Sequence, residues 1–175
     1  MKERILVPLD GTEIGEAVLP KLEDLILKAT PRMDVEVTLL HVISNLNFNV
    51  LTEDERAQLP IPPDELKERN EKAKSYLDKI AESLKSKGIE VKTMIKVGHV
   101  ADEIVKAARE INAHLIAMAT HGRSGIVRWA IGSVTDSVIR LEGTIPVLAV
   151  RATGKKEESP VIPIESLQSL VKHTG

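Results

Sequence analysis

Residues 5–9 read Ile-Leu-Val-Pro-Leu, an uninterrupted apolar run that is followed at once by Asp10 and Gly11. A short run without polar alternation is typical of a strand that is buried on both faces of its sheet. Such strands occur in parallel sheets, because the helices that connect successive parallel strands cover both faces. The opening of the chain therefore predicts a buried strand in an α/β fold.

Helical and strand-like segments alternate along the rest of the chain. Apolar residues recur at helical spacing from Glu13 to Ile26, and we expect Pro20 to bend the early turns of that helix. The expected later segments are a strand at 35–42, a helix at 66–84 that Gly88 closes, a half-exposed edge strand at 89–97, a helix at 104–111, a strand at 115–119, a helix at 133–141 and a strand at 147–150.

Alternation of this kind requires right-handed crossovers and a parallel sheet that is covered on both faces. We therefore predict a doubly wound α/β fold with a five-stranded parallel sheet in the order 3-2-1-4-5. In such sheets ligands bind beyond the carboxyl ends of the strands, where the winding direction reverses. The loops after the first and fourth strands are therefore the candidate site.

The chain has the length of one ordinary domain, which we assign to residues 1–152. Residues 45–63 are rich in Asn and Pro and are expected to form a mobile connector, with Thr52 and Glu55 capping one short helix. Residues 153–175 form the expected C-terminal tail. Its apolar residues either line one face of a short helix or belong to a frayed end: Ile164, Leu167, Leu170 and Val171.

Composition excludes several classes of function. The chain has no cysteine, which excludes disulfides, thiolate metal sites and cysteine nucleophiles and makes the cytoplasm the expected compartment. No apolar run approaches the roughly 20 residues of a membrane-spanning helix. The formal charge is −2 and the 24 basic residues are scattered, so we expect no nucleic-acid partner. Aromatic residues make up only 2% of the chain, which argues against a flavin site, and the five histidines show no metal-ligand spacing.

The segment 119–133 carries the strongest chemical signal. It reads Ala-Thr-His-Gly-Arg-Ser-Gly-Ile-Val-Arg-Trp-Ala-Ile-Gly-Ser and joins a buried strand to a helix. Its glycines allow bare backbone N–H groups and the positive end of the helix to approach an anion. The alternative is a structural loop in which Ser133 and Asp136 form a capping box. The spacing matches neither a Walker loop nor a dinucleotide-binding fingerprint, and by itself it leaves both possibilities open.

Four blocks of sequence together resemble the universal stress protein family. They are residues 5–12 (Ile-Leu-Val-Pro-Leu-Asp-Gly-Thr), 39–42 (Leu-Leu-His-Val), 132–135 (Gly-Ser-Val-Thr) and 146–150 (Pro-Val-Leu-Ala-Val). The family's nucleotide signature, Gly-x2-Gly-x9-Gly-Ser/Thr, falls on Ala119, Gly122, Gly132 and Ser133. The nine-residue gap is kept, and alanine replaces the first glycine. The resemblance covers residues 4–151 and implies an adenine nucleotide alpha hydrolase-like fold.

The resemblance implies that ATP binds between Asp10 and the segment 119–133, together with a divalent cation such as Mg²⁺ and without a built-in metal site. Pro8 and Asp10 would lie beside the ribose, and Val42 would form a wall for the adenine. The residues that would wrap the sugar and the phosphates are Ala119, Thr120, His121, Gly122, Arg123, Ser124 and Gly125. After Gly132, the start of the helix would face the phosphates through Ser133, Val134 and Thr135. For Asp10 the alternative is a helix cap for residues 11–13.

The same resemblance implies a nucleotide-dependent regulatory or stress-response protein. No residue receives a catalytic role, because neither Asp10 nor His121 has a visible orienting partner, and we expect at most weak ATP hydrolysis. The alternative is a nucleotide-independent dimeric adaptor of the same family that recruits a protein partner, and Ala119 is the residue that favours it. The sequence does not identify that client.

The last strand predicts a homodimer. In the expected strand order residues 147–150 lie at an edge, and they carry neither Lys nor an internal Pro to deter pairing. Two copies that meet antiparallel across a two-fold axis would pair both edges, as the resemblance also implies. Ile164, Leu167 and Leu170 of the tail could then pack on the partner subunit.

Overall fold

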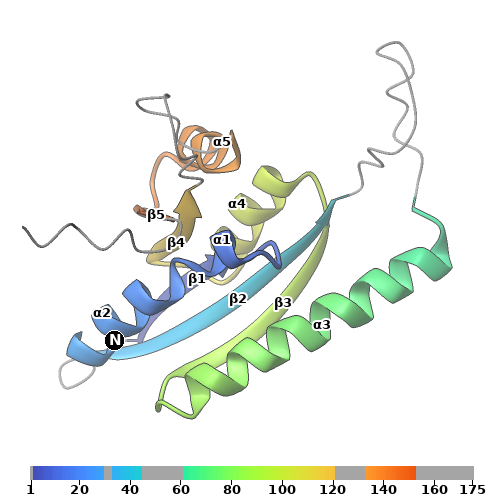
Figure 1. The fold of residues 1–175 in the computed structure, drawn as a ribbon. Helices are drawn as coiled ribbons and strands as arrows, with labels where there is room; N and C mark the ends of the chain where they lie inside the picture. The colour runs from blue at the N-terminus through green and yellow to red at the C-terminus, as the bar shows by residue number, and fades with distance from the viewer. Residues whose placement is uncertain (1, 30–32, 45–60, 121–132, 153–175) are drawn as a thin grey trace, which may run out of the picture.

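The computed structural model describes residues 2–29, 33–44, 61–120 and 133–152. These residues form a five-stranded parallel sheet in the order β3-β2-β1-β4-β5, with helices on both faces (Figure 1). The strands are β1 (Lys2–Pro8), β2 (Asp34–Ser44), β3 (Glu90–Gly98), β4 (Leu115–Thr120) and β5 (Val147–Arg151). The helices are α1 (Glu13–Glu16), α2 (Leu19–Ala29), α3 (Pro63–Lys85), α4 (Val100–Glu110) and α5 (Ser133–Glu142). The predicted fold class and strand order are both confirmed.

The apolar run that opens the chain contributes to two cores. Val7 faces α2 and α3 and belongs to the same buried cluster as Leu77. Leu6 faces the other side of the sheet and is clustered with Ile104 of α4 and Val138 of α5. Successive residues of a strand point to opposite faces, so a strand covered on both sides has no position for a polar residue. This burial is the physical reason for the unbroken apolar run.

The chain after β1 differs from the single bent helix that the sequence predicts. α1 ends at Glu16, and α2 begins at Leu19 as a separate helix. Pro20 is the second residue of α2, a position where the N–H that proline lacks would have no intrahelical acceptor. Proline therefore lies in the first turn of a new helix instead of bending a continuous one.

The end of α3 agrees with the prediction. Gly88 has a φ of +83°, which glycine adopts without strain, and its N–H donates to the carbonyl of Lys85 at 2.9 Å. The short helix expected at residues 52–55 lies outside the described residues, as do the segment 121–132 and the tail 153–175. Within the described ranges, no helix combines the length and apolarity that crossing a membrane requires.

β1 is the central strand, and it pairs with β2 on one side and β4 on the other. β3 continues the sheet beyond β2, and β5 continues it beyond β4. The chain thus winds outward from β1 in two opposite directions. The carboxyl ends of β1, β2 and β4 border the crevice where this fold class binds its ligands.

Candidate functional site

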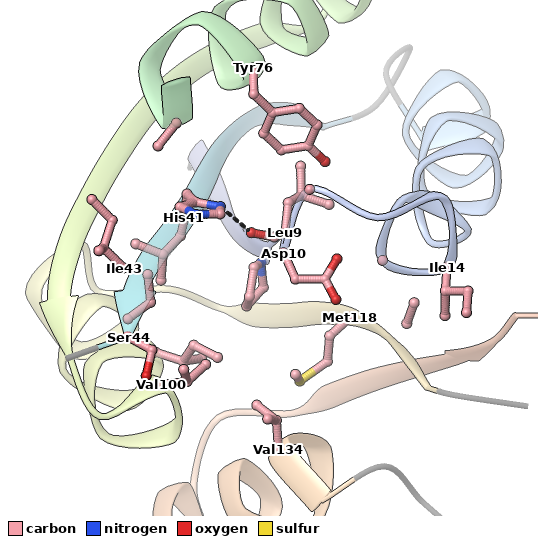
Figure 2. Close-up of a pocket in the computed structure, with 18 of the residues that line it drawn as sticks. Leu9, Asp10, Ile14, His41, Ile43, Ser44, Tyr76, Val100, Met118 and Val134 are labelled. Carbon is pink, nitrogen blue, oxygen red and sulfur yellow. Dashed lines mark hydrogen bonds between the residues drawn. The ribbon is translucent and has the colours of Figure 1, made fainter. Parts of the chain in front are cut away.

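A cavity of about 540 Å³ opens at the carboxyl ends of the central strands (Figure 2). Residues from seven parts of the fold line it: the end of β1 with the turn after it, α1, the end of β2, the amino-terminal part of α3 up to Tyr76, the start of α4, the end of β4 and the start of α5. A volume of several hundred Å³ is typical of a small-molecule site. The cavity therefore coincides with the crevice that the topology predicts.

On the side of α4 and α5 the cavity has an apolar wall. Its residues are Val42 at the end of β2, Val100 and Ile104 of α4, Met118 of β4 and Val134 of α5. Figure 2 shows Val100, Met118 and Val134 together on this side of the cavity. Apolar side chains of this kind exclude water from the face of a flat ring. They form no hydrogen bonds with the polar atoms at the edge of the ring.

Asp10 places a carboxylate in the cavity (Figure 2), and it is the only acidic residue among the described lining residues. Its Oδ1 atom accepts the backbone N–H of Thr12 at 2.9 Å and the Thr12 hydroxyl at 2.7 Å. Thr12 is in turn the N-cap of α1, because its hydroxyl oxygen accepts the N–H of Gly15 at 3.0 Å. Within the described residues no group donates to Asp10 Oδ2, which leaves this oxygen available to a ligand hydroxyl.

Gly15 makes room for this carboxylate. A Cβ atom at position 15 would overlap Oδ1 of Asp10. Real Cβ atoms do not approach an oxygen this closely, so the Asp10 conformation requires glycine at position 15. The turn after β1 therefore depends on two residues: Thr12, which donates to Oδ1, and Gly15, which leaves the space that Oδ1 occupies.

On the side of α3 the cavity has an aromatic corner made of His41 and Tyr76. Their ring centroids are 6.2 Å apart and the ring planes meet at 71°. His41 Nδ1 lies 2.9 Å from the carbonyl oxygen of Leu9 (Figure 2). The Tyr76 hydroxyl is buried and makes no hydrogen bond in the described part of the chain. Burial raises the pKa of Tyr76, and the nearby Glu16 carboxylate raises it further.

Two cations reach the cavity from the same helix. Arg69 Nη2 lies 2.5 Å from Glu65 Oε1, and Lys72 Nζ lies 2.6 Å from Glu68 Oε1. Ion pairs between exposed side chains one helical turn apart contribute only a few tenths of a kcal/mol, about 0.3–0.5. The pair with Glu68 therefore holds the exposed Lys72 only weakly.

Six predicted site residues line the cavity: Pro8, Asp10, Val42, Ala119, Val134 and Thr135. Thr120 and Ser133 do not line it. Thr120 is buried, and its carbonyl accepts the N–H of Ala152 at 3.1 Å, whereas Ser133 is exposed at the start of α5. The other predicted residues lie outside the described ranges: His121, Gly122, Arg123, Ser124, Gly125 and Gly132.

Sequence reasoning missed Gly15, His41 and the α3 residues Arg69 and Tyr76 as parts of the site. Two signals could have found some of them. His41 is a polar residue inside the apolar run of β2, and the buried stripe of α3 gives way to charged residues before Ala73. No comparable signal marks Gly15. Within the described ranges, no three His, Cys, Asp or Glu side chains are grouped as metal ligands would be.

Comparison with known proteins gives matches along most of the chain. The family model described as the universal stress protein family matches residues 1–151. Universal stress protein MJ0577 of Methanocaldococcus jannaschii is 33% identical over 161 residues, which cover 86% of this chain and 96% of that protein. Its solved structure superposes with a TM-score of 0.65 at 31% identity and covers 87% of this chain and 97% of that one.

Two more distant solved structures share the fold. One is a universal stress protein in complex with cAMP, with a TM-score of 0.60, 17% identity and coverage of 86% of this chain and 98% of that one. The other is a universal stress protein family member from Arabidopsis thaliana with AMP bound, with a TM-score of 0.57, 15% identity and coverage of 93% and 98%.

Proposed function

This chain belongs to the universal stress protein family, and from that premise we propose that it binds ATP in the cavity at the carboxyl ends of β1, β2 and β4. The observation that carries the proposal is the Asp10 carboxylate, which is held through one oxygen and has the other available beside an apolar wall. A nucleoside needs this combination, because its base is a flat ring and its ribose presents hydroxyl donors.

In this proposal the adenine lies against Val42 and Met118, and a ribose hydroxyl donates to Asp10 Oδ2. The phosphates extend toward Thr135 at the start of α5 and toward the segment 119–133. Positive partial charge at a helix N-terminus favours an anion there. The cAMP and AMP complexes of two proteins with the same fold support an adenine nucleotide as the class of ligand. A divalent cation such as Mg²⁺ would arrive with the triphosphate.

We propose a regulatory role in which bound ATP persists or turns over slowly. Asp10 is the one carboxylate among the described lining residues, and this proposal assigns it to the ribose, so no second described carboxylate is left to activate water at the phosphates. Turnover should therefore be far below the enzyme median of about 10 per second. Several turnovers per second by the pure protein, abolished by Asp10→Asn, would contradict this assignment.

We also propose a homodimer formed through β5. The two edge strands, β3 and β5, differ in the residues that deter pairing, and this difference supports β5 as the interface. β3 carries Lys92 and Lys96, side chains of the kind that deter pairing at an edge, whereas β5 has neither Lys nor Pro. In this dimer the tail 153–175 would begin next to the interface between the two β5 strands. It would not belong to the nucleotide-binding domain.

The test of ATP binding is calorimetry on protein stripped of nucleotide, with Trp129 fluorescence as a second readout. Trp129 is the only tryptophan and lies in sequence between the predicted phosphate-loop glycines. We expect Asp10→Ala to weaken ATP binding at least tenfold, because a hydrogen bond to a charged group contributes about 1.5–3 kcal/mol. The matched control is Asp24→Ala, which removes an exposed carboxylate paired with Lys28 on α2 and should bind ATP like the wild type.

A wild-type protein that binds no ATP at millimolar concentration would overturn the proposal and favour the nucleotide-independent adaptor. Titrations with AMP and cAMP in the same buffer would then show whether a smaller adenine nucleotide is the ligand.

A further inference from the structure

We infer that His41 is a positioning residue of the proposed nucleotide site, because its Nδ1–H group holds the Leu9 carbonyl and thereby fixes the peptide that carries Asp10. The expected effect of His41 on ligand binding rests on the proposed function. The hydrogen bond itself can be measured without a ligand.

The first step is where β1 ends. The ladder between β1 and β2 closes at the pair Pro8 and Leu40, whereas β2 continues to Ser44. One residue further, the N–H of Leu9 still donates to the carbonyl of Leu40 at 2.8 Å. The Leu9 carbonyl then takes the His41 side chain as its partner at 2.9 Å. An imidazole of the neighbouring strand thus binds the carbonyl of the first residue after β1, and this residue lines the cavity.

The second step is the protonation of the ring. A backbone carbonyl can only accept a hydrogen bond, so His41 Nδ1 must carry the hydrogen. In the neutral imidazole this leaves the lone pair on Nε2. The ring orientation is supported by Tyr76, whose ring meets it edge to face with centroids 6.2 Å apart.

The third step connects Leu9 to the ligand-binding oxygen. With both its N–H and its carbonyl bonded to β2, the Leu9 backbone cannot rotate without breaking a hydrogen bond. Asp10 follows directly, and its Oδ1 atom is held by Thr12. His41 and Thr12 therefore fix the backbone and the side chain of the same turn, and together they aim Oδ2 into the cavity.

Two substitutions separate donation by Nδ1 from other roles of the ring. In His41→Asn the amide nitrogen occupies nearly the position of Nδ1 and can donate to Leu9. In His41→Leu the volume is similar and no donor remains. We expect His41→Asn to bind ATP within about threefold of wild type and His41→Leu to lose at least tenfold, about 1.4 kcal/mol.

The matched control is His114→Leu. His114 also uses Nδ1 in a hydrogen bond with the β1 backbone, accepting the N–H of Arg4 at 3.1 Å, but at the opposite end of the sheet. This variant should bind ATP like the wild type. Equal losses of affinity in His41→Leu and His114→Leu would overturn the inference, because they would reflect general destabilisation of β1.

Nitrogen-15 NMR of the nucleotide-free protein tests the hydrogen bond directly. We expect the neutral form of the His41 ring to carry its hydrogen on Nδ1 and to leave Nε2 without one. The opposite tautomer would overturn the inference whatever the protein binds. In the same samples, hydrogen exchange at the Thr12 amide, the donor to Asp10, should accelerate in His41→Leu and not in His41→Asn. If the wild type binds no ATP, the proposed function fails, and unchanged Thr12 exchange in His41→Leu would separately overturn the positioning role.

Discussion

Three neighbouring residues hold the Asp10 carboxylate in place. Thr12 donates twice to Oδ1, Gly15 leaves the space that Oδ1 occupies, and His41 fixes the preceding carbonyl. Each of these residues acts on Asp10 through geometry. A change at any of them should therefore alter ligand binding without altering the chemistry of the group that touches the ligand.

The sharpest case is Gly15→Ala. Its Cβ would overlap Asp10 Oδ1, so the carboxylate must rotate out of its present position. We expect a loss of ATP affinity of at least tenfold, about 1.4 kcal/mol, measured by calorimetry.

A double-mutant cycle shows whether the loss acts through Asp10. In the Asp10→Ala background, Gly15→Ala should have little further effect, because the displaced group is already absent. Additive losses would instead indicate that Gly15 serves α1 in some other way.

At the scale of elements, charged side chains connect the amino-terminal ends of three strands, far from the cavity. Glu36 of β2 is 2.8 Å from Lys92 of β3 and 3.6 Å from Lys2 of β1. Its side chain is only 7% exposed. The Lys92 ammonium, and more weakly that of Lys2, hold the pKa of Glu36 below its ordinary value of 4.5.

This lowered pKa makes the stability of the sheet depend on pH. Because the carboxyl group binds its proton less readily in the folded chain, its contribution is present above pH 4.5 and is lost as the pH falls below that value. We expect Glu36→Gln to lower the free energy of unfolding by about 1 kcal/mol at neutral pH, and the difference from wild type to shrink at acidic pH.

Urea denaturation at pH 7 and about pH 3 measures both effects. Glu110→Gln is the matched control, since Glu110 is half exposed and pairs with Lys96 away from Glu36, and its effect should be smaller. ATP affinity at pH 7 should stay unchanged in both variants. If Glu36→Gln lowered the free energy of unfolding by the same amount at both pH values, the predicted pH dependence would be wrong.

At the scale of the whole molecule, the two edges of the sheet decide how copies of the chain meet. Leu148 and Val150 of β5 pack against the buried cluster that contains Val7 of β1 and Ala117 of β4, whereas Ala149 is exposed. A charge at Leu148 would therefore destabilise the fold as well as the β5 interface. Ala149 is the better position for testing the β5 interface, because a charge there would not enter the core.

We expect the wild type to sediment at twice its chain mass of 19.2 kDa at micromolar concentration, and Ala149→Lys to sediment as a monomer. Thr93→Lys is the matched control, because Thr93 is exposed on β3, the opposite edge, and should leave the dimer intact. A wild-type species of 19.2 kDa, or a dimer that only Thr93→Lys disrupts, would show that β5 is not the interface.

The sequence by itself determined the strands, their order and most of the helices. An unbroken apolar run predicted the buried central strand, Gly88 predicted the end of α3, and alternation of segments predicted the winding of the sheet. These features depend on the periodicity of burial and on the conformations of single residues, which are local properties. From the order of strands the position of the cavity followed, and the resemblance to the universal stress protein family added Asp10 and Val42 as residues of the site, both of which line the cavity.

Only the tertiary structure decided which distant side chains meet. His41 reaches the Leu9 carbonyl across 32 positions because the β1–β2 register places them side by side. Tyr76 reaches the cavity because α3 extends along the sheet to the end of β2. The split between α1 and α2 was likewise decided by the fold, since helical spacing continues through Pro20. Contacts of this kind depend on register and on the path of the backbone, neither of which leaves a local pattern in the sequence.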